Sequence, residues 1–257
     1  MKIIKILLII FFLNIKVIIN ANSLENKILL KIDNEIITSI DVYKEAKYLL
    51  AINDKINEMS QEEVYKISIN YLIKEKIRNI EIQKNISNEE IKIDDSYLDG
   101  LIENTYKRKG YQNLKDFKSH LNKHGVKISE IKNKIKNESL WNELIYKKFF
   151  SKVKINRDEL KNKVIEDNDK KIRFYLLSEI FFKKSVNKNL DQKFDLIRKD
   201  IIEKGFSSAA LLHSISDTAV NGGDLGWIEE RSLNPKIKDK ILNLNVGDFT
   251  NPIVIPG

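Results

Sequence analysis

Apolar residues recur every three or four positions through most of residues 24–168, a spacing typical of amphipathic helices. Ahead of them, KILLKIDNEIIT at residues 27–38 has two short apolar segments around an Asp-Asn pair, which predicts a strand–turn–strand hairpin. The sequences TSID at 38–41 and SQEE at 60–63 have the pattern of capping boxes and predict helices that end near residues 51 and 83. The longer helix is predicted to bury a stripe formed by Ile69, Leu72, Ile73, Ile77 and Ile80. Further helices are predicted at residues 95–108 and 113–124, from Ser129, and from Asn156 to about residue 167.

The pattern changes at Lys171, where KIRFYLLSEIFFK is a dense apolar run with β-favouring aromatic residues and predicts a strand. After it we expect a helix over 187–204, a short helix over 208–212, a glycine loop, a helix from Pro235 and an extended end at 252–255. The fold class is therefore predicted to be α+β. A mainly helical domain should occupy residues 22–168 and a smaller α+β domain residues 169–257, with the boundary near 167–170.

The first 21 residues have the layout of a secretory signal peptide. A basic start is followed by an unbroken apolar run at residues 6–13, and cleavage is expected after Ala21. An uncleaved membrane anchor is the alternative, but Asn14 and Lys16 keep the run well short of the ~20 apolar residues that a spanning helix needs. Removal of the segment lowers the formal charge from +8 to +5, because it contains three lysines and no acidic residue.

Composition excludes several classes of function. The chain has 45 lysines and arginines against 37 acidic residues, and the basic residues are mostly lysines interleaved with glutamates. This pattern is typical of solvated helix faces, and the clusters of arginine and aromatic residues that indicate nucleic-acid binding are missing. Because there is no cysteine, disulfides, thiolate nucleophiles and cysteine-based zinc sites are excluded.

Three short motifs have part of a catalytic pattern but lack essential members. His120 and His124 are spaced like the ligands on a zinc-protease helix, but Leu121 stands where the catalytic glutamate would be, so we expect a solvated helix end. In HSIS at 213–216 a histidine adjoins serines, but adjacency in sequence does not supply the geometry of a hydrolase triad. GGDLG at 222–226 lacks the Lys-Ser/Thr of a phosphate loop, and its aspartate would repel phosphate.

The stretch NGGDLGW at residues 221–227 is better explained as an architectural turn. Three of the nine glycines of the chain fall within it, and glycine permits positive φ angles and close approach of the backbone. Such a turn would present Leu225 and Trp227 to a neighbouring surface and shape an apolar cleft there.

The order and spacing of several segments resemble a parvulin-type peptidyl-prolyl isomerase domain over residues 172–257. These segments are LSEIFF at 177–182, KGFSSAALLHSISDTAVNGGDLGW at 204–227, and NPKIKDKILNLNVGDFTNPI at 234–253. Upstream, KILLKIDNEIITSIDV at 27–42 resembles the start of a SurA-type chaperone domain. A signal peptide, a helical chaperone domain and a parvulin domain in this order are similar to the SurA-type periplasmic chaperones of outer-membrane proteins.

The activity that this resemblance implies is rotation about Xaa–Pro bonds, whose barrier is about 18–20 kcal/mol because the twisted amide loses its resonance. The planar amide is the more charge-separated state. A dry apolar pocket that holds the proline ring therefore favours the twisted form, and no nucleophile or cofactor is needed.

The resemblance places the proline pocket at Leu225, Leu233 and Ile237, which are all apolar. The strand histidine of the family falls on Glu179, and its central Cys or Asp falls on Ser216, with Asp217 one position further on. The second histidine of the family belongs to a last strand beyond the closing glycine, so we expect this domain to lack that strand. These departures imply a degenerate catalytic site with weak isomerase activity.

Three functions are left open at this point: a periplasmic holdase, an active isomerase, and a membrane-tethered foldase that keeps its N-terminal segment. The expected partners are unfolded outer-membrane protein chains and proline-containing peptides. No nucleic acid, metal or cofactor is implied, and no stable membrane insertion is expected once the signal peptide is removed.

Overall fold

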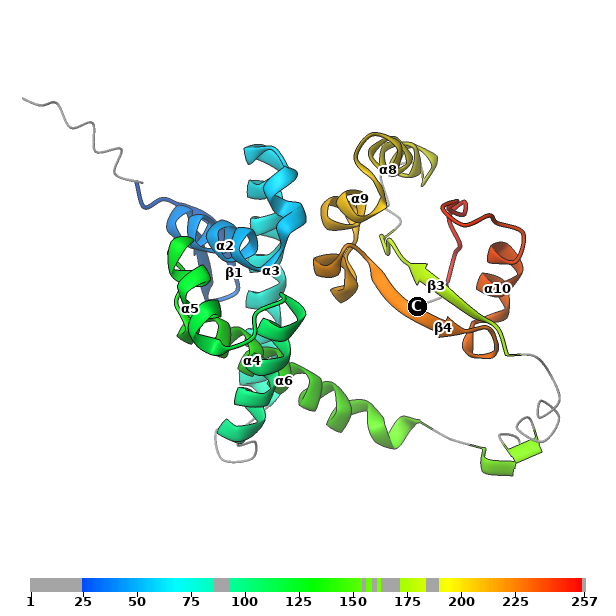
Figure 1. Cartoon of the computed structure of the whole chain (residues 1–257), viewed down its shortest axis with the longest axis horizontal. Helices are drawn as coiled ribbons and strands as arrows, with labels where there is room; N and C mark the ends of the chain where they lie inside the picture. Colours follow the sequence, from blue (N-terminus) through cyan, green and yellow to red (C-terminus); the bar gives the residue numbers. More distant parts are fainter. Residues whose placement is uncertain are drawn as a thin grey trace, which may run out of the picture.

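A computed structural model describes residues 25–85, 93–153, 156–158, 161–162, 172–183 and 190–255. The expected signal peptide and the expected boundary near 167–170 lie outside these residues. Figure 1 shows a helical N-terminal part and a C-terminal part that contains a small sheet.

The N-terminal part begins with the hairpin that the sequence predicts. Its strands β1 (Ile28–Ile32) and β2 (Glu35–Thr38) pair antiparallel, with Asp33 in the left-handed conformation at the turn. The helices and 3-10 turns that follow are α2 (Ser39–Ile52), η1 (Asp54–Glu58), α3 (Gln61–Asn85), α4 (Asp95–Arg108), α5 (Leu114–Lys123), α6 (Ile128–Phe149) and η2 (Phe150–Lys152).

Local hydrogen bonds explain where α2 and α3 begin. At α2 the Thr38 hydroxyl accepts from the Asp41 backbone N–H, while the Asp41 carboxylate accepts from the Thr38 N–H at 2.8 Å. Ser60 and Glu63 make the same reciprocal pair ahead of α3, at 3.0 and 3.3 Å. Both predicted capping boxes are confirmed, because each satisfies backbone donors that a helix start leaves free.

Two helix predictions need correction. The α6 helix begins at Ile128 and not at Ser129, because the Glu130 carboxylate accepts from the Lys127 N–H and makes Lys127 the N-cap residue. In α3 the predicted apolar stripe holds at Leu72 but not at Ile77, whose side chain is 51% exposed. The face of a 25-residue helix that meets its neighbours changes along its length, so one stripe does not describe it.

The C-terminal part is α+β, as the sequence predicts. Its elements are β3 (Phe174–Ser178), α8 (Leu190–Lys204), α9 (Phe206–His213), η3 (Asp217–Asn221), β4 (Asp224–Glu229), η4 (Glu230–Ser232) and α10 (Pro235–Ile241). β3 and β4 form an antiparallel two-stranded sheet, and no third strand joins it within the described residues. The segment at 252–255 is not part of that sheet.

The strand predicted over 171–183 is shorter than expected. β3 ends at Ser178, after which the backbone bonds to loops and not to a strand. The Phe181 N–H donates to the Ser214 hydroxyl at 3.0 Å, and the Phe181 carbonyl accepts from the Ile215 N–H at 2.7 Å. The high β propensity of the residues after Ser178 therefore did not extend β3, because β4 begins at Asp224 and offers no further strand residue to pair with.

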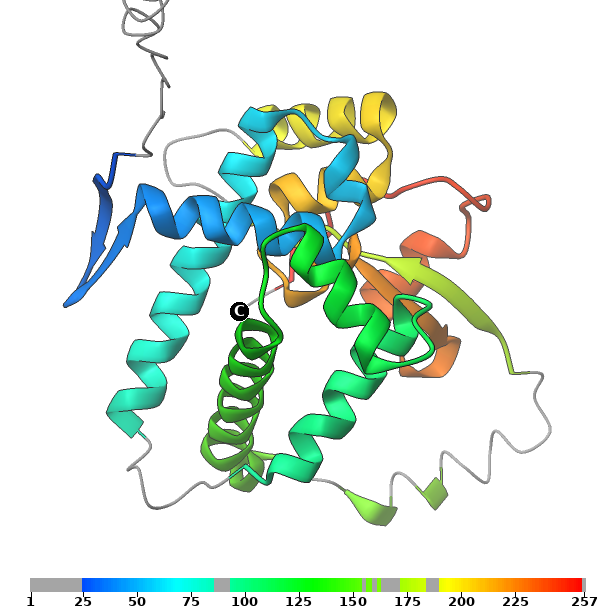
Figure 2. The same cartoon turned by 60° about the vertical axis from the view of Figure 1, so that its left-hand side comes forward.

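The two parts share an apolar contact. Leu211 of α9 is only 4% exposed and belongs to a cluster with four residues of the helical part: Leu49, Ile56, Val64 and Ile67. In both Figure 1 and Figure 2, α9 lies beside η1 and the first turns of α3. Among the residues that the structure describes, no helix has the length and apolar character needed to cross a bilayer.

Candidate functional site

The glycine loop packs its backbone directly against the end of β3. Gly222 and Gly223 have φ angles of 72° and 80°, and the Glu179 N–H donates to the Gly223 carbonyl at 2.8 Å. A Cβ atom on Gly223 would lie 2.2 Å from the Glu179 carbonyl oxygen. Both the positive φ and the close approach therefore require glycine at position 223. This bears out the architectural interpretation of the loop.

Leu225 occupies a β-bulge in β4. The register pairs Leu177 with Gly226 and Ser178 with Asp224, so Leu225 is the extra residue with no partner on β3. Bulges redirect a side chain and are common beside active sites. The Leu225 side chain is 39% exposed, so it remains accessible at the surface.

The structure brings Glu179 and Ser216 together. The Ser216 hydroxyl donates to Glu179 Oε1 at 2.6 Å, and the Thr218 hydroxyl donates to the same oxygen at 3.0 Å. Ser216 is also the N-cap residue of η3, which fixes the start of this turn. The carboxylate at the end of β3 is thus held by two hydroxyls from the segment that leads into the glycine loop.

Asp217 points elsewhere, toward the helical part. Its carboxylate pairs with the Arg78 guanidinium of α3, and Lys74, one turn earlier on α3, donates to the Ser216 carbonyl at 3.2 Å. Burial lowers the pKa of Lys74, although the Asp217 carboxylate acts in the opposite direction. Two cations of the N-terminal part therefore flank the segment that carries Ser216 and Asp217.

The other two predicted pocket residues follow β4. Leu233 comes directly after η4, and Ile237 lies in the first turn of α10, where the Asn234 side chain accepts from the Lys236 N–H at 3.0 Å. Both side chains are half-buried. That Leu225, Leu233 and Ile237 line one groove for a proline ring stays a prediction.

Three residues near this site were not predicted from the sequence. Thr218 was detectable in principle, because it lies two positions after Ser216 in the same turn. Lys74 and Arg78 were not, because the contact joins residues 139 or more positions apart and depends on how α3 meets η3. 

The motif at His120 and His124 is not simply a solvated helix end. His120 Nε2 lies 2.7 Å from the Ala51 carbonyl, which ties α5 to the end of α2, and the two imidazole rings are 4.8 Å apart. No group of three or more metal-ligating side chains is found in the described ranges.

A series of ionisable groups links α8, α9 and α3. His213 Nε2 donates to the Asp200 carboxylate at 2.6 Å, and Lys204 bridges Asp200 and Glu63 at 3.0 and 2.6 Å. Lys193 lies 3.3 Å from His213 Nδ1, which therefore accepts and leaves the imidazole neutral. Burial would raise the pKa of Asp200, but the hydrogen bonds from His213 and Lys204 outweigh it and lower that pKa.

His213 should make the stability of this region depend on pH. Burial lowers the pKa of His213, and the hydrogen bond to Asp200 counteracts this only in part. The folded chain therefore binds this proton less readily than the unfolded chain. We expect the free energy of unfolding to fall as the pH drops below about 6.5, by at most about 1.4 kcal/mol per pH unit for one proton. Urea unfolding at a series of pH values measures this slope.

His213→Gln should flatten the slope, and His124→Gln is its matched control. The pKa of His124 is also lowered, by burial and by His120, but this residue lies at the end of α5, within the helical part. Its replacement should remove only its own share of the pH dependence. A slope that is the same in the His213→Gln variant and the unmodified chain would contradict the role given to His213.

This chain is similar to known proteins in two comparisons. Residues 176–256 match the family described as Rotamase, PPIC-type PPIase domain. Chaperone SurA of Pseudomonas putida is 25% identical over 175 residues, which is 65% of this chain and 41% of that protein. Chaperone SurA of Pseudomonas syringae pv. syringae is 24% identical over 176 residues, with the same two shares. Chaperone SurA of Hahella chejuensis is 25% identical over 173 residues, 63% of this chain and 39% of that protein. The chain thus spans about two fifths of the length of these curated relatives.

Proposed function

Because the chain carries a PPIC-type rotamase domain at residues 176–256 and is similar to the SurA chaperones, we propose that it is a periplasmic folding factor. It binds unfolded outer-membrane protein chains, and its rotamase domain holds proline-containing segments with weak isomerase activity. The apolar contact at Leu211 holds the helical part and the rotamase domain side by side, close enough for one client chain to reach both.

The observation that carries the proposal is the bulge at Leu225, which lies opposite Leu177 and Ser178, just before Glu179. The bulge at Leu225 supplies an accessible apolar side chain near the end of β3. With Leu233 and Ile237 it forms the wall against which a proline ring packs. Apolar contact with the ring and exclusion of water favour the twisted amide over the planar one.

The Glu179–Ser216 pair supports the weak activity that we propose. The Ser216 and Thr218 hydroxyls both donate to Glu179 Oε1, so their protons are engaged within the protein. A negative carboxylate at this position offers no donor to a substrate carbonyl, and preorganised donors usually supply a large part of catalysis. Rotation then depends mainly on the apolar wall.

Leu225→Ala should lower kcat/KM toward an Xaa–Pro peptide by about 5- to 30-fold, because it removes roughly 1–2 kcal/mol of apolar contact with the ring. A protease-coupled assay measures this. Leu196→Ala is the matched control, since Leu196 lies on α8 and is 49% exposed, close to the exposure of Leu225. Equal rates in the two variants would reject the pocket assignment, and no turnover in the unmodified chain would leave a holdase without isomerase activity.

The chaperone role has its own measurement. Suppression of aggregation of an unfolded β-barrel protein should persist in the Leu225→Ala variant, because client binding also involves the helical part. Loss of suppression together with loss of turnover would instead place client binding in the rotamase domain alone.

N-terminal sequencing of the exported protein should find a start at or near Asn22, and a retained segment 1–19 would indicate a membrane-tethered foldase.

A further inference from the structure

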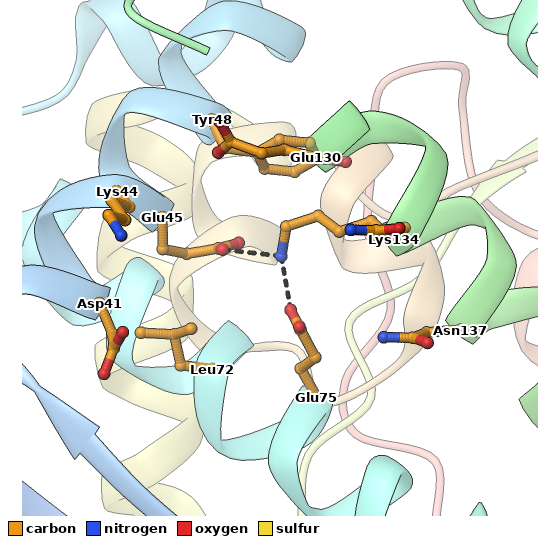
Figure 3. Close-up of a pocket in the computed structure, with 10 residues that line it drawn as sticks. Asp41, Lys44, Glu45, Tyr48, Leu72, Glu75, Glu130, Lys134 and Asn137 are labelled. Atoms are coloured by element: carbon orange, nitrogen blue, oxygen red, sulfur yellow. Dashed lines mark hydrogen bonds and ion pairs between the residues drawn. The ribbon is translucent and has the colours of Figure 1, made fainter. Parts of the chain in front are cut away.

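Two lysines near the start of α6 are paired with acidic residues of neighbouring helices. Lys134 lies 2.7 Å from Glu45 of α2 and 2.5 Å from Glu75 of α3, as Figure 3 shows. Lys132 pairs with two aspartates of α4. The C-terminal end of the same helix departs from this pattern.

The end of α6 opens a basic segment that contains no acidic residue. Neither aspartate nor glutamate occurs from residue 144 to residue 157. The same stretch contains five basic residues: Lys147, Lys148, Lys152, Lys154 and Arg157. It therefore carries +5, although the formal charge of the whole chain is only +8.

This end of the helix also exposes large apolar side chains. Every residue from 146 to 153 is exposed, and we call this surface the α6 end. Four of its side chains are apolar or aromatic and are 45–64% exposed: Tyr146, Phe149, Phe150 and Val153. The Tyr146 and Phe150 rings lie 4.7 Å apart, and Lys152 Nζ lies 5.1 Å from the centre of the Phe149 ring. Aromatic rings and ammonium groups thus share one accessible surface.

The helix dipole accounts for the lysines of the α6 end but not for its rings. Lysines in the last turn of a helix interact favourably with its free carbonyl groups. That effect needs no aromatic neighbours, and leaving apolar rings in water is unfavourable. Figure 1 shows the last turns of α6 extending beyond the other helices of the N-terminal part. A contiguous apolar surface that no described element covers indicates an interaction site.

Charge and apolar character together identify the partner as an anionic lipid surface. Each lysine near acidic phospholipid headgroups is worth about fivefold in affinity. Aromatic rings favour the boundary between headgroups and acyl chains, and lysine stems can lie along that boundary while their ammonium groups reach the phosphates. A polypeptide partner would account for the rings, but it gives no reason for a charge of +5 without one acidic residue.

We propose that the α6 end binds the surface of an anionic phospholipid membrane. The contact is peripheral: Phe149 and Phe150 enter the headgroup region, and Lys147 and Lys152 lie against the phosphates. Lys148 pairs with Glu81 of α3 at 3.1 Å, which ties this end of the helix to the helical part. The surface needs no client chain and no proline, so it goes beyond the proposed folding function.

The test measures sedimentation of the protein with lipid vesicles. It uses the exported form that starts at Asn22, because the apolar residues 1–21 would themselves bind lipid. Vesicles of phosphatidylethanolamine with one quarter phosphatidylglycerol should bind it at least about tenfold more tightly than phosphatidylcholine vesicles. Raising NaCl from about 0.05 M to about 0.5 M should weaken this binding at least about fivefold, because salt screens the charges. Equal binding to the two kinds of vesicle, or no binding to the anionic ones, would overturn the proposal.

Replacing both rings tests the apolar contribution. Phe149→Ser combined with Phe150→Ser should lower the affinity for anionic vesicles about tenfold or more. The matched control is Leu196→Ser combined with Ile202→Ser, two apolar residues of α8 that are 49% and 72% exposed. Acidic and basic residues are equal in number on α8, so this pair should have little effect. An equal loss in both double variants would reject the α6 end as the site.

Replacing two lysines tests the charge and keeps the proposal falsifiable if the double serine variant does not fold. Lys147→Gln combined with Lys152→Gln should weaken binding to anionic vesicles about tenfold or more and leave phosphatidylcholine binding unchanged. Lys115→Gln combined with Lys118→Gln removes the same charge from the exposed face of α5 and should change binding by under about twofold. Similar losses in the two pairs would show that only the net charge matters, and the site would be wrong.

A local signal and a second assay separate a membrane from a polypeptide partner. The fluorescence that Phe150→Trp adds to that of Trp141 and Trp227 should shift to the blue with anionic vesicles, and no shift would contradict the contact. The double serine variant should still suppress aggregation of an unfolded β-barrel protein. If it binds vesicles normally but no longer suppresses aggregation, the α6 end binds unfolded chains and the membrane proposal fails. Failure of the rotamase assay would affect neither result.

Discussion

Gly223→Ala is expected to destabilise the rotamase domain by about 3–5 kcal/mol, which is exceptional for the addition of one methyl group. At φ = 80° the new Cβ would lie 2.2 Å from the Glu179 carbonyl oxygen. That oxygen is backbone, and the Glu179 N–H is bonded to the Gly223 carbonyl itself at 2.8 Å. The clash can be relieved only by moving β3 away from the loop, which separates Glu179 from Ser216.

Gly226→Ala is the control for the φ angle alone. Gly226 has a φ of 71°, but no atom lies within 4 Å of its ideal Cβ position. Only the left-handed backbone conformation is then penalised, at roughly 1–2 kcal/mol. Urea unfolding followed by tryptophan fluorescence measures both variants, since β4 contains Trp227. Equal losses in the two variants would mean that close packing against Glu179 is not the reason for glycine at position 223.

Lys134→Met should cost about 3–5 kcal/mol near neutral pH, because it leaves a buried carboxylate without its cation. Glu45 is 3% exposed and depends on Lys134 for its ion pair. The pKa of Glu45 is already raised by burial, and loss of Lys134 raises it further. A raised carboxyl pKa favours the folded state at low pH, and this advantage is lost as the pH rises above 4.5, the ordinary value. The deficit of the variant should therefore be smaller at about pH 5 than at about pH 8.

Two further variants separate the buried pair from ordinary lysine effects. Lys132→Met removes a cation on the same helix whose partners Asp95 and Asp99 are largely exposed, so it should cost under about 1 kcal/mol. Adding Glu45→Gln to Lys134→Met removes the uncompensated charge and should recover part of the loss. A Lys134→Met loss that does not change with pH, or that equals the Lys132→Met loss, would contradict this account.

Capping residues made the helix starts predictable. Thr38 with Asp41, and Ser60 with Glu63, act within three positions of each other, so their hydrogen bonds do not depend on the rest of the fold. The start of α6 was placed one residue late because Glu130 paired with Lys127 and no serine cap formed. The capping pattern is compatible with a helix start at Ile128 or at Ser129, and the sequence alone does not decide between the two.

The candidate site was predictable only in part. The correspondence with the parvulin pattern pointed to Glu179 and Ser216, and the structure places the Ser216 hydroxyl 2.6 Å from Glu179 Oε1. It did not show that Asp217 turns toward Arg78, because that ion pair joins η3 to α3, 139 positions apart in the sequence. The exposure of Ile77 was missed for a related reason, since a helical stripe does not say which neighbour covers each turn.

The sequence by itself determined the local features: the hairpin at residues 28–38, the capped helices, the glycine turn and the α+β class of the C-terminal part. These depend on interactions between neighbouring residues and on the φ angles that each residue tolerates. Only the tertiary structure decided that Leu225 is displaced by a bulge, that α9 packs on the helical part, and that Lys134 joins Glu45 to Glu75. Those arrangements depend on burial and charge pairing between distant segments, and burial is a property of the assembled chain.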